Sequence, residues 1–399
     1  MPFANLGLSQ PISQAIEKEG YNKPTNIQTR AIPEILQGVD LIAAAQTGTG
    51  KTASFVLPML EKLSQGATQR KKRVRGLILS PTRELAIQID DKVKTYGKNL
   101  SLTSLAMYGG VDDKSQKQAL IEGVDILVAT PGRLLDMYGQ RAIHFDEVEM
   151  LVLDEADRML DMGFIDDINK ILSLLPKDIQ TLLFSATLSH KVRDLAKTAV
   201  YNPVEISITA NQASKKNIEQ WLITVDKDKK SALLSHLIKT NNWDQALIFI
   251  ETKHGAAKLV QQLEKRGIEA EAFHSGRSQV VRTQLLEDFK TGSIKYMVAT
   301  GVGARGIDIE GLTRVVNYDL PFPADEYIHR IGRTGRADAL GEAISFVSKD
   351  NFKNLCMIES RLGHLLERRE IEGFEPRKPV PVSILNYVPK NKRQGKGNQ

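Results

Sequence analysis

The sequence of 399 residues has few of the features that mark secreted, zinc-binding or membrane proteins. Its single cysteine, Cys356, cannot form a disulfide within the chain and excludes a cysteine-based zinc site. None of its 7 histidines belongs to a cluster with metal-ligand spacing. No apolar run reaches the ~18–20 residues that span a bilayer, and residues 1–10 lack the charged and apolar regions of a secretory signal. We therefore expect a soluble cytoplasmic protein.

The composition is that of an ordinary globular chain. Hydrophobic residues make up 41%, charged residues 26% and aromatic residues only 6%, which argues against a mainly disordered protein. At about 150 residues per domain, the length predicts two or three domains. The formal net charge of +6 divides into −1 for residues 1–210 and +7 for residues 211–399. This excess fits nucleic-acid binding, but it is also found in tails that are merely solvated.

Short apolar runs alternate with amphipathic stretches such as 52–63 and 84–96, the pattern of parallel sheets flanked by helices. Two series of strands are expected, at 41–44, 77–80, 126–129, 151–153 and 182–184, and then at 247–250, 297–299, 315–318 and 344–347. The two series predict an α/β fold with two similar domains in tandem.

Composition also predicts the boundaries of these domains. Residues 209–217 are small and polar without apolar periodicity, so we interpret them as a linker between domains at 1–208 and 218–371. Beyond residue 371 the chain is rich in proline and ends in a basic run. Residues 372–399 are therefore predicted to form a basic, disordered tail.

The segment Ala45-Gln-Thr-Gly-Thr-Gly-Lys-Thr52 follows an apolar run and opens a helix-like stretch, the context of a phosphate-binding loop. Glycines let backbone N–H groups point into one concavity, and the helix N-terminus adds positive potential. Lys51 would reach the terminal phosphates and Thr52 would bind magnesium. The match alone also fits an ordinary turn. The predicted ATP-binding residues of this loop are Ala45, Gln46, Thr47, Gly48, Thr49, Gly50, Lys51 and Thr52.

Two adjacent carboxylates end the apolar run 151–153 in the same half of the chain. Asp154 is suited to position Mg²⁺, directly or through water, and Glu155 to orient and activate an attacking water. An acidic strand exit is common by itself. Together with the phosphate loop, it predicts hydrolysis of a nucleoside triphosphate.

The run Asp154-Glu-Ala-Asp157 is the motif of the DEAD-box ATP-dependent RNA helicases, and the chain resembles this family from Phe3 to about Glu370. The resemblance implies two tandem RecA-like domains, each a mainly parallel sheet flanked by helices, with a basic C-terminal tail. It also implies ATP as substrate, Mg²⁺ as cofactor and RNA as partner, held through its phosphodiester backbone with little sequence specificity.

The segment from Gly20 to Gln28 is similar to the Q motif of the family, and Phe3 stands at the family's spacing before it. The resemblance implies that Phe3 stacks on adenine, that Gln28 reads the edge of this base, and that Lys23 belongs to the same ATP site. Without the family, Gln28 would be an ordinary surface residue of a helix.

Three further segments of the first half are similar to family motifs that hold RNA, namely 80–86, 109–110 and 130–133. Each alone is also an ordinary helix cap or turn, although hydroxyls, arginines and free N–H groups at such places commonly bind phosphates. The RNA contacts implied here are Thr82, Arg83, Gly110, Thr130 and Arg133.

The run Ser185-Ala-Thr187 resembles the motif that couples the ATP state to strand separation. We expect Ser185 and Thr187 to form hydrogen bonds with the carboxylates near Asp157, so that the nucleotide state is relayed through them.

The segment 326–336 contains the sequence His329-Arg-Ile-Gly-Arg-Thr-Gly-Arg336. Arg333 and Arg336 lie three residues apart, the spacing of neighbours on one helical face, and guanidinium groups so placed suit a γ-phosphate. A basic helix that faces RNA or forms ion pairs is the alternative. In the family, Arg333 and Arg336 act on ATP, while His329 and Arg330 help to join the domains.

The segment 298–308 resembles motif V with two departures, because Gly301 replaces a common aspartate and Gly303 a common alanine. Extra glycines add backbone freedom to this loop. Thr300 still matches an RNA contact and Asp308 a contact to the ATP ribose. By the same resemblance, two residues of segment 279–282 are phosphate contacts, Gln279 and Arg282.

These features predict an RNA-stimulated ATPase, an RNA helicase that closes on single-stranded RNA and locally unwinds short duplexes. Two alternatives stay open, an ATP-gated RNA clamp or scaffold without productive unwinding and a DNA helicase built on the same core. Within the family, the compact start and residues 158–164 look most like the bacterial RhlE-like subgroup. That subgroup is associated with ribosome assembly and RNA turnover, so factors of these processes are candidate partners, and no membrane partner is expected.

Overall fold

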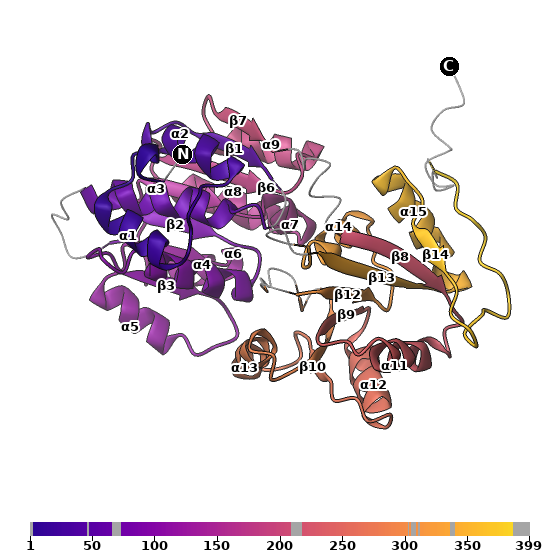
Figure 1. The fold of residues 1–399 in the computed structure, drawn as a ribbon. Helices are drawn as coiled ribbons and strands as arrows, with labels where there is room; N and C mark the ends of the chain where they lie inside the picture. The colour runs from indigo at the N-terminus through magenta and orange to yellow at the C-terminus, as the bar shows by residue number, and fades with distance from the viewer. Residues whose placement is uncertain are drawn as a thin grey trace, which may run out of the picture. The chain divides into compact units, whose positions relative to one another are not determined.

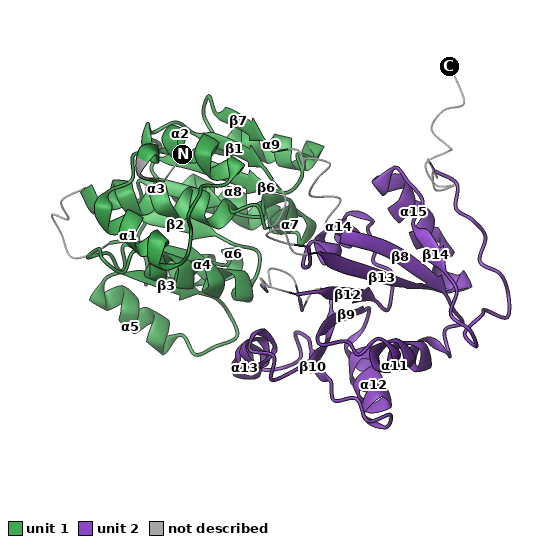
Figure 2. Cartoon of the chain, viewed as in Figure 1, with its two compact units in different colours: residues 1–210, 306–308 green, residues 211–305, 309–399 purple. Residues whose placement is uncertain are grey.

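The chain forms two compact units (Figure 2). Of the described residues, those up to 208 belong to unit 1 and those from 218 onward to unit 2. The predicted linker, 209–217, lies outside the described residues, as do the predicted site residues Gln46, Thr47, Asp308 and Arg336. No described helix is long and apolar enough to cross a membrane. The computed structural model describes residues 3–45, 48–65, 73–208, 218–301, 303–304, 309, 312–335 and 340–385 (Figure 1).

Unit 1 is built on a parallel sheet of seven strands, counted over its described residues, in the order β3-β4-β2-β5-β6-β1-β7. Its strands are β1 (Leu41–Ala44), β2 (Gly76–Leu79), β3 (Ser104–Met107), β4 (Ile126–Ala129), β5 (Met150–Leu153), β6 (Gln180–Ser185) and β7 (Val204–Ser207). Its helices are η1 (Phe3–Leu6), α1 (Gln10–Lys18), α2 (Asn26–Leu36), α3 (Lys51–Gln65), α4 (Arg83–Tyr96), α5 (Lys114–Glu122), α6 (Pro131–Gly139), α7 (Ala156–Asp161), α8 (Ile165–Leu174) and α9 (His190–Ala199).

Helices cover both faces of this sheet, because its central strands are apolar on both sides. Ile78 and Val152 point into one core, with side chains of α1 to α4. Their neighbours Leu77, Leu151 and Leu153 point into a second core, with side chains of α6 to α9. This alternation buries every residue of β2, β4 and β5, as a parallel sheet between two helical layers requires.

Unit 2 has the same kind of architecture. Its described residues form a second parallel sheet of seven strands, in the order β10-β11-β9-β12-β13-β8-β14. Its strands are β8 (Ile218–Thr224), β9 (Ala246–Ile250), β10 (Glu271–Phe273), β11 (Tyr296–Thr300), β12 (Arg314–Asn317), β13 (Gly341–Val347) and β14 (Glu367–Arg369). Its helices are α11 (Lys230–Thr240), α12 (Lys253–Glu264), α13 (Gln279–Lys290), α14 (Asp325–Ile331), η2 (Lys349–Asn351) and α15 (Phe352–Leu362).

The predicted α/β class with two parallel sheets is confirmed. The sequence patterns missed β8 and all four strands at the sheet edges, which are β3, β7, β10 and β14. An edge strand has only one neighbour and is only partly covered, so its sequence need not form a continuous apolar run. Residues 104–106 of β3, for example, are only half-buried.

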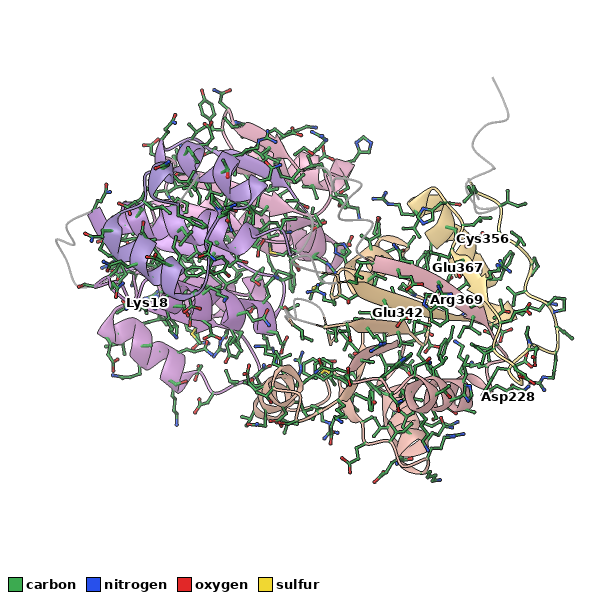
Figure 3. All side chains as sticks on the ribbon, viewed as in Figure 1. Lys18, Asp228, Glu342, Cys356, Glu367 and Arg369 are labelled. Atoms are coloured by element: carbon green, nitrogen blue, oxygen red, sulfur yellow. The ribbon has the colours of Figure 1, made fainter. Side chains whose placement is uncertain are left out.

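The predicted disordered tail does not begin at residue 372. Arg368 beside α15 donates to the carbonyls of Val380 at 3.0 Å and Pro381 at 2.7 Å, and the Val380 side chain joins the core of unit 2. The Ser383 hydroxyl donates to the buried Glu359 carboxylate of α15. Cys356, on the same helix, is labelled in Figure 3. An apolar side chain and hydrogen-bonded carbonyls thus hold residues 380–383 against the unit. Residues 386–399 of the predicted tail lie outside the described residues.

This packing predicts that replacing Val380 by Asp destabilises unit 2 by roughly 2–5 kcal/mol, because a buried apolar side chain becomes a charge without a partner. Urea unfolding would measure the effect. Val382, two residues further on, is 63% exposed and provides the matched control. Equal stability of the Val380→Asp and Val382→Asp variants would show that this segment does not contribute to the core.

Candidate functional site

The phosphate loop and the acidic motif of unit 1 lie at one edge of its sheet. β1, β6 and β5 are neighbours, and their parallel register places Ala44 beside Ser185 and Leu153 beside Leu183. The segments that follow these strands therefore leave the sheet side by side at its carboxyl edge, where α/β proteins bind ligands. The Ala45 N–H fixes the start of the loop by donating to the Ser185 carbonyl at 3.0 Å.

Lys51 is a buried cation in the first turn of α3. The residue is 7% exposed, and its Nζ has no hydrogen-bond partner among the described residues. Gly48 and Gly50 precede it with φ of 81° and 90°, values that glycine adopts without strain. Because a buried ammonium without a partner is unfavourable, this end of the helix suits a ligand that brings negative charge.

Gln28 joins α2 to the phosphate loop. Its Oε1 accepts from the Thr25 N–H at 2.8 Å, and its Nε2 donates to the Gly50 carbonyl at 3.2 Å. A Cβ at residue 50 would lie 2.5 Å from this Nε2, so the contact also requires glycine. Gln28 is fully buried, Phe3 is a core residue at 6% exposure, and Lys23 is exposed. The contacts of these three residues with ATP stay predictions.

Asp154 and Glu155 lie where β5 meets α7. The Asp154 carboxylate accepts from the Glu155 N–H at 2.9 Å, and Glu155 adopts a left-handed backbone with φ of 50°, which is uncommon outside glycine. Burial raises the pKa of Asp154 to about 7, Lys51 acts in the opposite direction, and the charges of Glu155 and Asp157 add to the rise. The buried Glu155 Oε2 has no hydrogen-bond partner in the described part of the chain.

Asp157 connects the acidic motif to the segment after β6. Its Oδ2 accepts from the Thr187 N–H at 3.0 Å and from the Thr187 hydroxyl at 3.1 Å. The Ser185 hydroxyl donates to the Thr187 carbonyl at 2.7 Å. These bonds join the first turn of α7, which follows β5, to the segment that follows β6. The coupling role of these residues stays a prediction.

The donors at this edge fit Mg²⁺ and a nucleoside triphosphate. Mg²⁺ prefers oxygen ligands, which Asp154 and the half-buried Thr52 of α3 would supply. The Lys51 ammonium suits the phosphates, and the cation would favour the ionised form of Asp154 that burial disfavours.

The residues predicted to hold RNA in unit 1 lie at the same carboxyl edge, after β2, β3 and β4. Thr82 caps α4, where its hydroxyl accepts from the Leu85 N–H at 3.3 Å. The Arg83 guanidinium fills the space beside Gly110, whose φ of 82° also favours glycine. The Thr130 N–H continues the sheet by donating to the Met107 carbonyl at 3.0 Å, and Thr130 then starts α6.

Arg133 of α6 completes this set. Its Nη1 bonds Asp136 at 2.8 Å and its Nε bonds Gln116 at 3.3 Å, while Gln116 donates to the Tyr108 carbonyl at 3.1 Å. Its buried Nη2 has no hydrogen-bond partner among the described residues, and the contact of Arg133 with an RNA phosphate stays a prediction. The sequence patterns missed Gln116, a residue with no local motif that connects α6 to the segment after β3.

Thr300, Gln279 and Arg282 are placed together in unit 2. Thr300 ends β11 and its hydroxyl accepts from the Gly303 N–H at 3.2 Å. The Arg282 guanidinium lies 5.0 Å from the centre of the Phe273 ring and donates to the Gly303 carbonyl at 3.2 Å. Gln279 and Arg282 are 5% and 6% exposed, so Arg282 braces the loop after β11 in this structure, and its phosphate contact stays a prediction.

The helical spacing expected for Arg333 and Arg336 is wrong for Arg333, because α14 ends at Ile331. Gly332 is its C-cap, and the Arg333 N–H then bonds the Arg330 carbonyl at 3.2 Å in a turn. Arg333 and His329 are 3% and 9% exposed. His329 and Arg330 lie in α14, and Arg330 pairs with Glu326 of the same helix, so the alternative of a basic helix with ion pairs stays open for them but not for Arg333.

Arg330 connects α14 to the strand ends of unit 2. Its Nη1 donates to the Asp319 carbonyl at 2.9 Å and lies 3.5 Å from Asn317 Oδ1. The Asp319 carboxylate accepts from Lys230 at 3.2 Å and from the Glu251 N–H at 3.1 Å. The sequence patterns missed Asp319, although its place directly after an expected strand was a usable signal.

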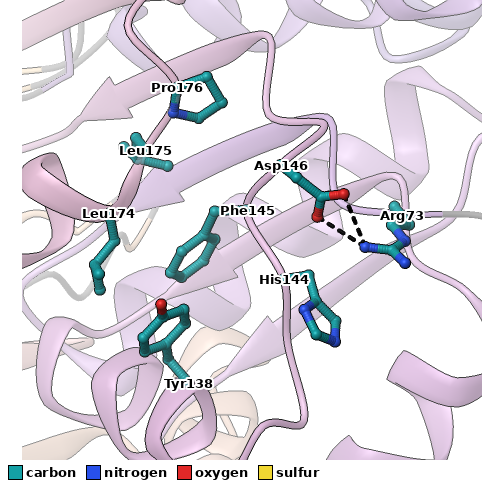
Figure 4. A pocket seen from close by; sticks show the side chains of 8 residues that line it. All are labelled: Arg73, Tyr138, His144, Phe145, Asp146, Leu174, Leu175 and Pro176. Carbon is teal, nitrogen blue, oxygen red and sulfur yellow. Dashed lines mark hydrogen bonds and ion pairs between the residues drawn. The ribbon is translucent and has the colours of Figure 1, made fainter.

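A separate hollow of about 450 Å³ lies in unit 1 near the amino ends of β2, β5 and β6 (Figure 4). Tyr138 stacks on Phe145 there, with ring centres 5.2 Å apart, and Arg73 pairs with Asp146 at 2.7 Å. None of the predicted site residues lines it. Functional side chains are instead gathered at the opposite, carboxyl edge.

These features define a class of protein, a nucleoside triphosphate hydrolase with two RecA-like domains. Family models extend this result, since residues 25–195 match the DEAD/DEAH box helicase model and residues 228–338 match the helicase conserved C-terminal domain. The chain is 42% identical to the DEAD-box ATP-dependent RNA helicase CshA of Bacillus cereus, over 92% of its own length and 69% of that protein. It is 38% identical to the ATP-dependent RNA helicase DbpA of Bacillus subtilis, over 98% and 81% of the two chains.

Solved structures agree with the sequence relatives. S. cerevisiae Dbp5 bound to RNA and ADP BeF3 is similar with a TM-score of 0.82 and 35% identity, over 92% of this chain and 95% of that one. Mss116p bound to ssRNA and AMP-PNP is similar with a TM-score of 0.83 and 29% identity, over 94% and 79%. The chain belongs to the DEAD-box ATP-dependent RNA helicases, which are RNA-stimulated ATPases that use ATP with Mg²⁺. The RhlE-like subgroup stays a prediction.

The raised pKa of Asp154 predicts a pH-dependent effect on stability in the absence of Mg²⁺ and nucleotide. The folded pKa of about 7 lies above the ordinary value of 3.8, so the carboxyl is protonated in the fold but ionised in the unfolded chain between these values. Stability is therefore lost as the pH rises from about 4 to 7. Asp154→Asn should remove this loss and be more stable than the wild type by about 2–4 kcal/mol at pH 8, with a much smaller gain near pH 4.

Urea unfolding in EDTA at the two pH values would measure this difference. Asp166→Asn, at an exposed position of α8, is the control and should change stability at neither pH. A gain for Asp154→Asn that is equal at both pH values would contradict the raised pKa.

Proposed function

We propose that this chain hydrolyses ATP while it closes on single-stranded RNA, and that it thereby unwinds short duplexes locally. The main support is the buried charge at the carboxyl edge of unit 1. Lys51 Nζ and Glu155 Oε2 have no hydrogen-bond partner among the described residues. Burial raises the pKa of Asp154, while the charge of Lys51 lowers it. Such a site is complete only with a ligand that carries both phosphates and a cation.

In this proposal each residue has one task. Lys51 binds the terminal phosphates, Asp154 and Thr52 hold Mg²⁺, and Glu155 orients and deprotonates the attacking water. Asp157 relays the state of this site to Thr187 through the two hydrogen bonds they share. When bound, Mg²⁺ would neutralise charge at the phosphates. Phosphate binding, activation of the attacking water and the relay to Thr187 depend on the protein side chains.

Further tasks are assigned by the resemblance to the family. Arg333 and Arg336 would act on the γ-phosphate in the ATP-bound state, with Asp308 on the ribose. RNA would be held through its backbone by residues of both units, which are Thr82, Arg83, Gly110, Thr130, Arg133, Gln279, Arg282 and Thr300. If ATP and RNA both favour the closed state, each raises the affinity for the other.

An RNA clamp without productive unwinding and a DNA helicase are the competing functions. Matched RNA and DNA duplexes separate them, because a clamp binds RNA in the presence of ATP but releases no strand, and a DNA helicase unwinds the DNA duplex. The bound RNA and nucleotide in the structures of Dbp5 and Mss116p favour RNA as the partner. We further propose a cytoplasmic role in ribosome assembly or RNA turnover, with factors of these processes as partners.

The role of Glu155 in the chemical step can be tested directly. Single-stranded RNA should stimulate ATP hydrolysis by the wild type, and the Glu155→Gln variant should lose at least about 10²-fold of the stimulated rate, because the amide cannot take a proton from water. The KM for ATP should change little. A matched single-stranded DNA is the control substrate. Equal rates with RNA, DNA or neither would reject the proposed function.

Another prediction concerns the basic end of the chain. Deleting residues 390–399 removes four positive charges, so it should weaken binding of single-stranded RNA while the maximal RNA-stimulated ATPase rate stays within about twofold. The slope of log RNA affinity against log salt concentration should decrease in magnitude by up to about 3. Replacing the four basic residues by Gln in the full-length chain separates charge from length. Unchanged RNA affinity in both variants would show that the basic end does not contribute to RNA binding.

A further inference from the structure

Helix α14 contains two buried side chains of opposite charge, one turn apart. Arg330 Nε lies 3.9 Å from Glu326 Oε1, and the two side chains are 7% and 9% exposed. The guanidinium also lies 4.9 Å from the centre of the Phe249 ring. Together with its bond to the Asp319 carbonyl, these contacts fix Arg330 between α14 and the ends of β9 and β12.

Gly301 lies directly beside this pair, in the loop that follows β11. A Cβ at residue 301 would stand 3.0 Å from Arg330 Nη2 and 3.5 Å from Glu326 Oε1. The φ of Gly301 lies outside the left-handed region, so its backbone does not require glycine. The missing side chain therefore provides space for the pair rather than freedom for the chain.

The space beside Gly301 is different in kind from the space beside Gly303. A Cβ at residue 303 would lie 3.0 Å from the Phe273 carbonyl oxygen and 3.0 Å from His274 Cα, which are backbone atoms. Beside Gly301 the neighbours are the ends of two charged side chains, which can move. A carboxylate placed at 301 would thus reach the same guanidinium that Glu326 now approaches from α14.

We propose that Glu326 is the positioning residue for Arg330, and that its carboxylate can approach the guanidinium from the helix because Gly301 leaves the space beside the pair open. The proposal rests on the proposed function, because its consequence is the alignment of the segment that follows Arg330. The Arg333 N–H bonds the Arg330 carbonyl at 3.2 Å, so a displacement of the Arg330 backbone at the end of α14 also moves Arg333. Gly301 follows Thr300, so the same pair also supports the end of β11.

The test moves the carboxylate from one position to the other. Glu326→Gln leaves Arg330 without this charge and should lower the kcat of the RNA-stimulated ATPase about tenfold, with the KM for ATP nearly unchanged. Gly301→Asp alone sets two carboxylates side by side and should also lower kcat. The double variant Gly301→Asp/Glu326→Gln has one carboxylate again, and its kcat should return to within about threefold of the wild type.

The control is Asp325→Asn on the same helix. Asp325 pairs with Arg361 at 2.6 Å, but the two side chains are 48% and 49% exposed, so kcat should not change. Thermal unfolding of every variant separates activity from stability. Should Glu326→Gln fail to fold, Glu326→Asp keeps a carboxylate but withdraws it from Arg330, so its kcat should fall below that of the wild type, and an unchanged kcat would contradict the positioning role.

These measurements distinguish a wrong positioning role for Glu326 from a wrong proposed function. A double variant with a kcat no higher than that of the weaker single variant would overturn the positioning role, as would recovery of the unfolding temperature without recovery of kcat. A wild-type chain without RNA-stimulated hydrolysis would overturn the proposed function and this inference together. Recovery of kcat in the double variant, with kcat lowered in both single variants, would support the positioning role of a carboxylate beside Arg330.

Discussion

The parallel register of neighbouring strands is the constraint on which both sets of functional residues depend. Because β1, β6 and β5 end together, segments that are far apart in the chain leave the sheet at adjacent points. The same holds for β9, β11 and β12 in unit 2, where Phe249 pairs with both Ala299 and Asn317. Side chains need only stand one or two residues beyond their strand to meet, which is why short motifs can assemble a site.

This arrangement gathers buried charge that the protein alone leaves incompletely compensated. Lys51 and Glu155 each have a buried polar atom without a hydrogen-bond partner among the described residues, and Glu155 holds a left-handed backbone. Burial also keeps the pKa of Asp154 far above its ordinary value. These unfavourable terms are tolerated because two well-packed helical layers cover the sheet, and they become favourable when phosphates and a cation are bound.

Three arginines of the predicted site, Arg83, Arg282 and Arg330, pack against residues of their own unit in this structure. Arg83 fills the space beside Gly110, Arg282 braces the loop at Gly303, and Arg330 lies against Phe249 and Glu326. Arg282 and Arg330 thus have hydrogen-bond partners within their own unit, and Arg83 packs against Gly110 in its own. Residues that motifs mark for RNA binding or for joining the domains thus also pack against loops and strand ends of their own unit, and the effect of replacing them combines both roles.

The local sequence was sufficient for the central strands, the phosphate loop and the acidic motif. Continuous apolar runs are a direct consequence of burial on both faces, and the motif residues follow such runs immediately. It was not sufficient for the edge strands, for the packed segment 380–383 or for the end of α14 at Ile331. Edge strands depend on partners from distant parts of the chain. Val380 is buried because Arg368 bonds its carbonyl and its side chain packs in a core with residues of α15. Tertiary structure alone decided that Gly301 borders Glu326 and Arg330, since no spacing in the sequence encodes a contact between a loop and a helix that different strands position.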